Sequence, residues 1–285
     1  MNPGSISNVL RYGKTILAEA DIETSAIDAA LLLAHALSVS KTYIYAHTEE
    51  IITSEQHEQY IDFLNRRLSG LCTAYIIRRK EFRFLNLYVD ENVLVPRPDT
   101  ETLVEAVLDF IDAAKDTRIR TLLDMCTGSG AVALALKQEY PALDVTASDI
   151  SLKALEIAAR NAVEYGIEAR FVHSNLFQNI TNRFDIITAN APYIPAACIA
   201  GGLARETGNE PVLALNGGHD GMEIIRKIVA AAPEHLTKGG SLFLEASPGQ
   251  ICEIARMLKE TGFEESIVRK DIAGLNRVIW ASLKI

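Results

Sequence analysis

The sequence has few of the residues that mark a disulfide-rich, metal-binding or membrane-spanning protein. Only four of its 285 residues are cysteines, and they form no CxxC pair: Cys72, Cys126, Cys198 and Cys252. The six histidines form no HExxH motif, so no metal site is expected. No apolar run is long enough to cross a bilayer, and the first residues lack the basic and apolar regions of a secretory signal. We therefore expect a cytoplasmic protein with reduced thiols and no membrane association.

Positive charge is also scarce. There are 28 Lys and Arg residues against 37 Asp and Glu residues, which gives a net charge of −9. A phosphate-binding surface needs a local excess of basic residues. The one dense basic run, residues 78–80 with Arg83 nearby, is more typical of a solvated hairpin edge. The charge therefore weighs against a nucleic-acid substrate, and no direct contact with nucleic acid is expected.

The hydrophobic pattern divides the chain into three regions. Residues 1–72 have helical spacing, with helices expected over 25–38 and over 54–70, the second with Ser54 as its N-cap. Residues 73–96 alternate and are rich in aromatic and β-branched residues, which predicts a β-hairpin linker. A helix over 97–115 then opens the third region, residues 97–285.

Strands and helices alternate from about residue 118 onward. Because the pattern is βαβα, we expect a Rossmann-like α/β fold, a mostly parallel sheet with helices on both faces. The last two strands have no helix between them, which predicts an antiparallel edge hairpin. Asp220 and Glu223 have the spacing of a capping box at one helix start. Strands are expected at 118–126, 144–149, 168–174, 184–190, 240–246, 265–271 and 276–284, and helices at 131–140, 151–166, 220–236 and 249–262.

A glycine-rich loop follows the first strand of this region. Gly128 and Gly130 allow a tight turn and a close approach of backbone to ligand, and the next helix offers free N–H groups. Asp149 ends the following strand, 21 positions after Gly128, where a carboxylate can accept both hydroxyls of a ribose. Asn175 and Leu176 follow the third strand at the same sheet edge, where they could border an adenine ring; a plain polar turn would explain either residue equally well. The predicted cofactor residues are Asp124, Cys126, Thr127, Gly128, Ser129, Gly130, Asp149, Ile150, Asn175, Leu176 and Asn190.

The sequence Asn190, Ala191, Pro192, Tyr193 ("NAPY") follows the fourth strand, at the same edge. An amide nitrogen is a poor nucleophile, so an enzyme that alkylates it must hold its N–H bonds and direct its lone pair. The side-chain oxygen of Asn190 and the main-chain carbonyl of Ala191 are two suitable acceptors. Tyr193 can pack against the flat amide. The same arrangement would suit the exocyclic amine of a nucleic-acid base.

These motifs resemble those of the HemK/PrmC family, protein-(glutamine-N5) methyltransferases that act on peptide chain release factors in translation termination. The resemblance covers nearly the whole chain and includes "VLVPRPDTETLVE", "DMCTGSGAVALAL", "NAPYIP", "NEPVLALNGGHDGMEII" and "LFLEASPGQ". It implies that S-adenosyl-L-methionine lies over the glycine loop and that Asp149 meets its ribose. It also implies that residues 190–193 grip the glutamine of the Gly-Gly-Gln loop of class I release factors. Residues 97–285 would be the methyltransferase domain.

The resemblance also bears on substrate choice and docking. The segment Pro96–Glu101 resembles the release-factor enzymes more than those that methylate a ribosomal-protein glutamine. The helices of residues 1–72 and the loop Ile194–His219 would form the docking surface for the protein substrate, and a monomer is expected. "NEP" (Asn209–Pro211) lies in that loop, and a plain surface turn would explain it equally well.

Four positions depart from the family pattern. Cys126 and Arg78 stand where glycine is usual, Asn175 where aspartate is usual, and Ala191 where proline is usual. A side chain at position 126 is tolerable if its φ is negative. Ala191 keeps the carbonyl that the chemistry uses. None of the four changes removes a group that methyl transfer requires.

Three other functions stay open. A nucleic-acid adenine-N6 methyltransferase would share the amine-holding motif, but the acidic charge disfavours it. A nicotinamide-dependent oxidoreductase fits Gly128, Gly130 and Ala133 but leaves residues 190–193 unexplained. A non-catalytic binding module would explain the four departures, but Asn190, Tyr193 and Asp149 are retained.

Overall fold

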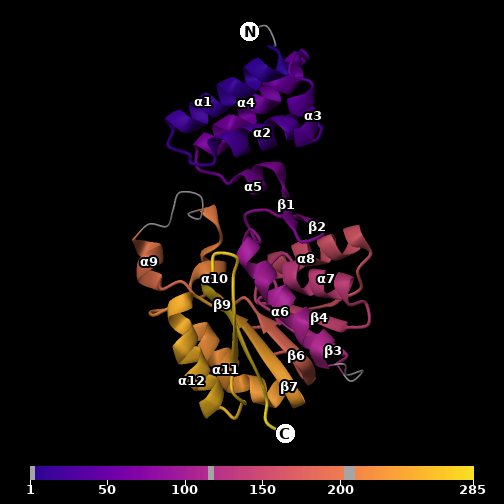
Figure 1. The fold of residues 1–285 in the computed structure, drawn as a ribbon, viewed down its shortest axis with the longest axis vertical. Helices are drawn as coiled ribbons and strands as arrows, with labels where there is room; N and C mark the ends of the chain where they lie inside the picture. The colour runs from indigo at the N-terminus through magenta and orange to yellow at the C-terminus, as the bar shows by residue number, and fades with distance from the viewer. Residues whose placement is uncertain (1–3, 115–118, 202–208) are drawn as a thin grey trace. The chain divides into compact units, whose positions relative to one another are not determined.

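The computed structural model describes residues 4–114, 119–201 and 209–285, which form two compact units. The first unit consists of residues 4–79 together with Asn209, and the second of the remaining described residues. Figure 1 labels their helices and strands. No helix within the described ranges is long and apolar enough to cross a membrane. Three predictions extend beyond the described residues. They are the end of the helix predicted over 97–115, the start of the strand predicted over 118–126, and residues 202–208 of the loop Ile194–His219.

The first unit is helical, as the sequence predicts. Its core is built from aliphatic and aromatic side chains of the longer helices, among them Leu17, Leu33 and Leu64. The predicted N-cap of the fourth helix is wrong by one residue. Thr53, not Ser54, is the N-cap, because its hydroxyl accepts from the Gln56 amide while the Gln56 side chain accepts from the Thr53 amide. The helices are α1 (Ile6–Glu19), α2 (Ser25–Ala36), α3 (Lys41–Ala46), α4 (Ser54–Leu68) and α5 (Thr73–Ile77).

A buried ion pair joins α2 to α4 inside this unit. Arg67 Nε lies 2.8 Å from Asp28 Oδ2, and both side chains are almost fully buried. Since burial removes both charges from water, either one left alone would be costly. The pair therefore ties the two helices together in one arrangement.

The hairpin is shorter than the sequence predicts. Its strands are β1 (Arg79–Phe82) and β2 (Leu85–Tyr88), whereas residues 73–77 form the short helix α5 with Tyr75 and Ile76 buried. So short an apolar segment has too few residues for periodicity to separate helix from strand. Arg78 ends α5 with φ of 59°, in the left-handed region that favours glycine.

The second unit contains a seven-stranded sheet of the predicted class. Its strand order is β5-β4-β3-β6-β7-β9-β8, with β9 antiparallel to both β7 and β8 and the other pairs parallel. The antiparallel edge hairpin is therefore confirmed. The strands are β3 (Thr121–Met125), β4 (Asp144–Asp149), β5 (Arg170–His173), β6 (Phe184–Ala189), β7 (Leu236–Glu245), β8 (Ile267–Lys270) and β9 (Asn276–Ser282).

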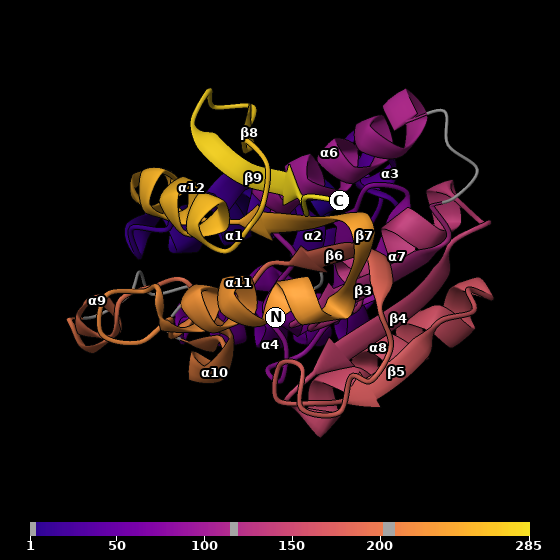
Figure 2. The same ribbon diagram turned by 90° about the horizontal axis from the view of Figure 1, so that it is seen from below.

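Helices cover both faces of this sheet, and each face has its own core. Figure 2 shows α6 (Pro98–Ala114) and α7 (Ala131–Glu139) on one side and α11 (Glu223–His235) and α12 (Ile251–Glu260) on the other. Strand order reverses between β4-β3 and β3-β6, which is where doubly wound sheets bind ligands. The remaining elements are α8 (Leu152–Tyr165), α9 (Ala196–Ala200), α10 (Val212–Leu215) and η2 (Pro248–Gln250).

The predicted capping box at α11 is wrong in detail. The helix begins at Glu223 with Met222 as its N-cap. Asp220 accepts from the Met222 amide at 3.1 Å, and Glu223 accepts from the His219 amide at 2.9 Å. Both acids do bind backbone N–H groups at this terminus, but the glycine-rich turn before the helix shifts the pairs.

Replacing Asp28 by alanine should destabilise the first unit by about 3–5 kcal/mol, because Arg67 would keep its buried charge without this partner. Urea unfolding followed by circular dichroism measures the change. Asp62→Ala is the matched control, since Asp62 pairs with Arg66 at 3.9 Å on the surface of α4. That control should cost less than about 1 kcal/mol. Equal losses for the two variants would contradict the account.

Candidate active site

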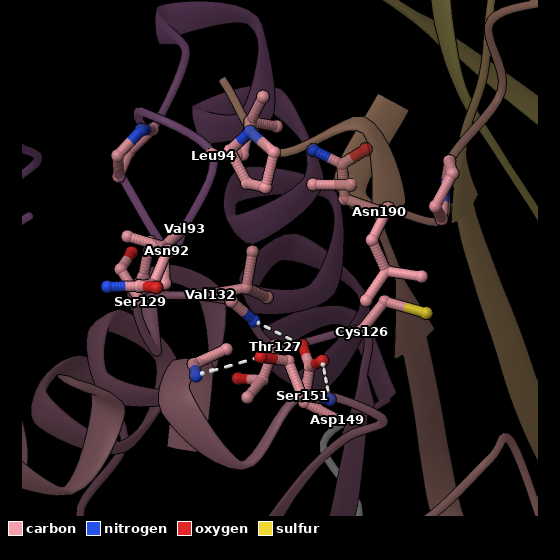
Figure 3. Close-up of a pocket in the computed structure, with 18 of the residues that line it drawn as sticks. Asn92, Val93, Leu94, Cys126, Thr127, Ser129, Val132, Asp149, Ser151 and Asn190 are labelled. Atoms are coloured by element: carbon pink, nitrogen blue, oxygen red, sulfur yellow. Dashed lines mark hydrogen bonds between the residues drawn. The ribbon is translucent and has the colours of Figure 1, made fainter. Parts of the chain in front are cut away.

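Two adjoining cavities lie at the carboxyl ends of the central strands. Their volumes are about 220 Å³ and 100 Å³. The larger one runs from Asp149 and the glycine loop to Asn190; in Figure 3, Asn190 lies near the top of the view and Asp149 near the bottom. Predicted site residues that line the larger cavity are Asp124, Cys126, Thr127, Gly128, Ser129, Asp149, Ile150, Asn190 and Pro192.

Asp124, at the end of β3, holds the glycine loop in place through hydrogen bonds to two hydroxyl groups. Its Oδ2 accepts from the Thr127 hydroxyl at 2.6 Å and its Oδ1 from the Thr188 hydroxyl at 2.8 Å. Burial raises the pKa of Asp124 to about 6, although these two hydrogen bonds oppose the rise. The loop is thus fastened to β3 and β6 at once.

Asp149 fastens the other side of the same loop. Its Oδ2 accepts from the Gly128 amide and its Oδ1 from the Ser151 amide, both at 2.9 Å. Burial raises the pKa of Asp149, while these amides lower it. The Ile150 amide is a third donor to this carboxylate, which has about four acceptor sites, so one site is left for a ribose hydroxyl.

The two glycines of the loop, Gly128 and Gly130, are needed for different structural reasons. Gly128 has φ of +55°, and a Cβ added there would meet nothing within 4 Å, so open space lies directly over its backbone. Gly130 has φ of +84°, and its Cβ would lie 3.1 Å from Leu134 Cδ1 and 3.2 Å from Ala158 Cβ. Gly130 therefore lets α7 and α8 pack closely, whereas Gly128 leaves room for a ligand. This room and the fixed Asp149 carboxylate fit a nucleoside cofactor.

Cys126 departs from the expectation of a negative φ. Its φ is +55°, so it holds a left-handed conformation that a glycine would hold at lower cost. The side chain packs against the core on the α11 face. Burial raises the pKa of the Cys126 thiol, so it stays protonated at neutral pH.

The smaller cavity contains the pair predicted to border an adenine ring. Asn175 and Leu176 both line it, together with Ile150 and Pro192. Leu176 has φ of +51°, a conformation supported by its carbonyl, which accepts from the Ser174 hydroxyl at 2.6 Å. The two predicted residues are thus brought to the same cavity as Asp149.

The loop of residues 190–193 is held from both ends. Asn190 Nδ2 donates to the Thr100 hydroxyl at 3.0 Å, and Tyr193 donates its hydroxyl to Glu245 Oε1 at 3.3 Å. Ala191 is 1% exposed and belongs to the core on the α11 face. Gly130, Ala191 and Tyr193 are the predicted site residues that do not line either cavity.

Glycines of the following loop support this segment. A Cβ at Gly221 would lie 2.3 Å from the Tyr193 carbonyl oxygen, and one at Gly217 would lie 2.7 Å from the Pro192 carbonyl oxygen. Gln250 Nε2 also donates to the Tyr193 carbonyl at 3.0 Å. Close backbone packing therefore fixes the loop, although Ala191 replaces the proline usual in the family.

The sequence interpretation did not predict two of the walls of the larger cavity. One wall consists of Glu91, Asn92, Val93, Leu94, Pro96 and Arg97, and another of Pro211, Leu213 and Ala214. An ion pair between Arg97 and Glu210 joins these two walls, and Glu210 Oε1 also accepts from the Val95 amide at 3.0 Å. Glu210 is buried, so "NEP" is more than a surface turn. Only the resemblance of "PRPDTE" and "NEP" to family motifs marked these segments.

The glycine turn under the cavity, the acid that ends the next strand and the antiparallel end of the sheet fit an S-adenosyl-L-methionine-dependent methyltransferase, and the comparisons with known proteins show that class. The family model "Methyltransferase small domain" matches residues 101–205, and "PrmC N-terminal domain" matches residues 8–77. Two curated proteins named release factor glutamine methyltransferase are similar. The Bradyrhizobium diazoefficiens protein is 35% identical, covering 97% of this chain and 94% of its own. The Coxiella burnetii protein is 38% identical, and the match covers 91% of this chain and 92% of its own. The chain belongs to the family of release factor glutamine methyltransferases.

Solved structures show the same fold at low identity. The T. thermophilus 16S rRNA methyltransferase solved with AdoMet and guanosine has a TM-score of 0.55 at 20% identity, covering 72% of this chain and 50% of its own. The hMettl16 catalytic domain has a TM-score of 0.58 at 14% identity, and the match covers 78% of this chain and 82% of its own. These two similarities concern the fold alone.

Gly128→Ala should weaken S-adenosylmethionine binding at least about tenfold, because its Cβ would enter the open space above the loop. Isothermal titration calorimetry measures the affinity. Gly166→Ala is the matched control, since Gly166 also has a positive φ, of +62°, and no atom within 4 Å of an added Cβ, but lines neither cavity.

Both alanine variants should lose about 1–2 kcal/mol of stability for the left-handed backbone. Only Gly128→Ala should lose affinity for the cofactor. Equal affinities in the two variants would show that the cofactor does not lie over Gly128.

Proposed function

We propose that the protein methylates the side-chain amide nitrogen of the glutamine in the Gly-Gly-Gln loop of class I release factors. The observation that carries this proposal is the orientation of Asn190. Its NH2 group is engaged by Thr100 at 3.0 Å, so its Oδ1 is the atom left to accept a hydrogen bond. Asn190 lines the same cavity as Gly128 and Asp149. The names of the relatives support the release factor as substrate.

The reaction needs an oriented amide nitrogen more than it needs an acid or a base. S-adenosylmethionine, when bound, supplies a methyl group activated by a positively charged sulfur. Asn190 Oδ1 and the Ala191 carbonyl would accept the two N–H bonds of the glutamine amide and direct its lone pair into the cavity. This requires the Ala191 carbonyl to become accessible when the substrate binds, because Ala191 is 1% exposed. Both oxygens would also stabilise the positive charge that develops on that nitrogen. Because the methylated amide is then strongly acidic, its proton leaves without a dedicated base.

Docking of the protein substrate would involve surfaces outside the cavity. The helical unit and the loop Ile194–His219 are the proposed docking elements, although residues 202–208 of that loop lie outside the described residues. We expect the protein to act as a monomer in the cytoplasm. Direct nucleic-acid binding is not proposed, since the net charge is −9 and Arg83 and Arg97 are already paired with carboxylates.

The substrate is tested with radiolabelled S-adenosylmethionine and a class I release factor, beside the same factor with its loop glutamine changed to alanine. Label on the glutamine form alone supports the proposal. Label on both forms, or on DNA instead, would contradict it.

Asn190→Ala should reduce kcat at least about 100-fold, because the amide loses one of its two acceptors. The affinity for S-adenosylmethionine should change only a few-fold. Asn175→Ala is the contrasting variant, since Asn175 lines the smaller cavity. That change should weaken cofactor binding and leave kcat at saturation nearly unchanged. An Asn190→Ala enzyme with normal kcat would refute the amide-holding role.

A further inference from the structure

The side chain of Gln250 joins three segments at the sheet edge that carries the site. Its Nε2 donates to the Tyr193 carbonyl at 3.0 Å and to the Gly221 carbonyl at 3.2 Å, and its Oε1 accepts from the Ser247 amide at 3.0 Å. Ser247 lies just after β7, Tyr193 ends the loop of residues 190–193, and Gly221 lies in the turn before α11. The amide oxygen and both amide hydrogens of one side chain are thus engaged.

These partners admit one orientation of the Gln250 amide. A main-chain N–H can only donate a hydrogen bond, and a main-chain carbonyl can only accept one. If the oxygen and nitrogen of the side chain were exchanged, the carbonyl groups of Tyr193 and Gly221 would each face an oxygen. The Ser247 amide would face an NH2 group. Both carbonyl groups therefore depend on the NH2 group of Gln250.

Helix capping explains only one of these three hydrogen bonds. Ser247 and Gln250 form a capping box at η2, in which the Gln250 oxygen accepts from the Ser247 amide. Glutamate serves as well as glutamine at this position of a capping box. The NH2 group, by which glutamine differs from glutamate, is used on Tyr193 and Gly221. The contacts with these two loops therefore call for glutamine.

The contact with Tyr193 anchors the acceptor loop at the end opposite Asn190. Asn190 is held by Thr100 at 3.0 Å. Only Ala191 and Pro192 lie between Asn190 and Tyr193, and the proline ring fixes one of their backbone torsions. Any movement that exposes the Ala191 carbonyl to a substrate is thereby confined to these two residues.

The contact with Gly221 holds the turn that packs against this loop. A Cβ at Gly221 would lie 2.3 Å from the Tyr193 carbonyl oxygen and 2.9 Å from Gln250 Nε2, so these groups meet in a space that admits no side chain. In the same turn, a Cβ at Gly217 would lie 2.7 Å from the Pro192 carbonyl oxygen. Loss of the Gln250 NH2 group would therefore loosen the turn and the loop together.

We propose that Gln250 is a positioning residue for methyl transfer, whose NH2 group holds the acceptor loop in place beside the cofactor cavity. The inference rests on the proposed function, because it concerns the same glutamine amide. Gln250 lines neither cavity, whereas Asn190 and Pro192 line the larger one, so Gln250 acts on the reaction through the loop. A shift of the loop would misdirect the Asn190 oxygen while leaving Gly128 and Asp149 in place.

Gln250→Glu isolates the NH2 group, because a carboxylate keeps the oxygen that caps η2 but cannot donate. The two carbonyl groups would then face a negatively charged oxygen, so the loop should move. We expect kcat at saturating S-adenosylmethionine and release factor to fall about 10- to 100-fold. The affinity for S-adenosylmethionine, measured by isothermal titration calorimetry, should stay within about twofold of the wild-type value.

Gln138→Glu is the matched control, since it adds the same charge at an exposed position of α7 that lines neither cavity. Its kcat and cofactor affinity should equal those of the wild type. A kcat for Gln250→Glu that equals that of this control would overturn the proposal. So would a parallel loss of kcat and cofactor affinity, which indicates a general loosening of the second unit instead of a misplaced loop.

Gln250→Met is a second test that does not depend on the folding of Gln250→Glu. Methionine has a similar length and no charge, and it offers no N–H donor. Its kcat should also fall about 10- to 100-fold, with cofactor affinity retained. Circular dichroism shows whether each variant is folded. Failure of both variants to fold would assign Gln250 to the stability of the unit and overturn the positioning role.

The two proposals fail in different ways. A wild-type protein that labels no release factor overturns the proposed function and the positioning role with it. An active wild type beside an equally active, folded Gln250→Glu or Gln250→Met enzyme would overturn the positioning role alone.

Discussion

The hydrogen bond from Asn190 to Thr100 is the contact on which the acceptor side of the site depends. It joins the end of β6 to the first turn of α6, and it uses the Asn190 NH2 group so that the oxygen stays available. Thr100 is 4% exposed, so water does not compete for this bond. Two elements far apart in the sequence thus meet at one buried hydroxyl.

The cofactor side is built on the same sheet edge but by different contacts. Asp124 and Asp149, from neighbouring strands, hold the glycine loop through Thr127 and Gly128. These carboxylates act on the backbone and hydroxyls of the loop, whereas Asn190 is the group offered to a substrate amide. Because both sides rest on the rigid ends of parallel strands, the distance between cofactor and acceptor is set by the sheet.

The sequence predicted what local patterns determine and missed what long-range packing determines. Alternating strands and helices, the glycine loop and Asp149 follow from periodicity and spacing, and the fold class is confirmed. Residues 73–77 are helical because tertiary packing buries Tyr75 and Ile76, which no short pattern shows. The positive φ of Cys126 was also hidden, since its residue type argues against it. Thr100 and Glu245 could not be predicted, because their partners lie 90 and 52 positions away.

The central claim is that Thr100 makes Asn190 present its oxygen, and one pair of variants tests it. Thr100→Val removes the hydroxyl while keeping the shape of the side chain, and Thr100→Ser keeps the hydroxyl. The measurement is kcat for release-factor methylation at saturating S-adenosylmethionine. The account predicts a loss of at least about tenfold for Thr100→Val and nearly normal kcat for Thr100→Ser. Equal, near-normal kcat values in both variants would contradict it.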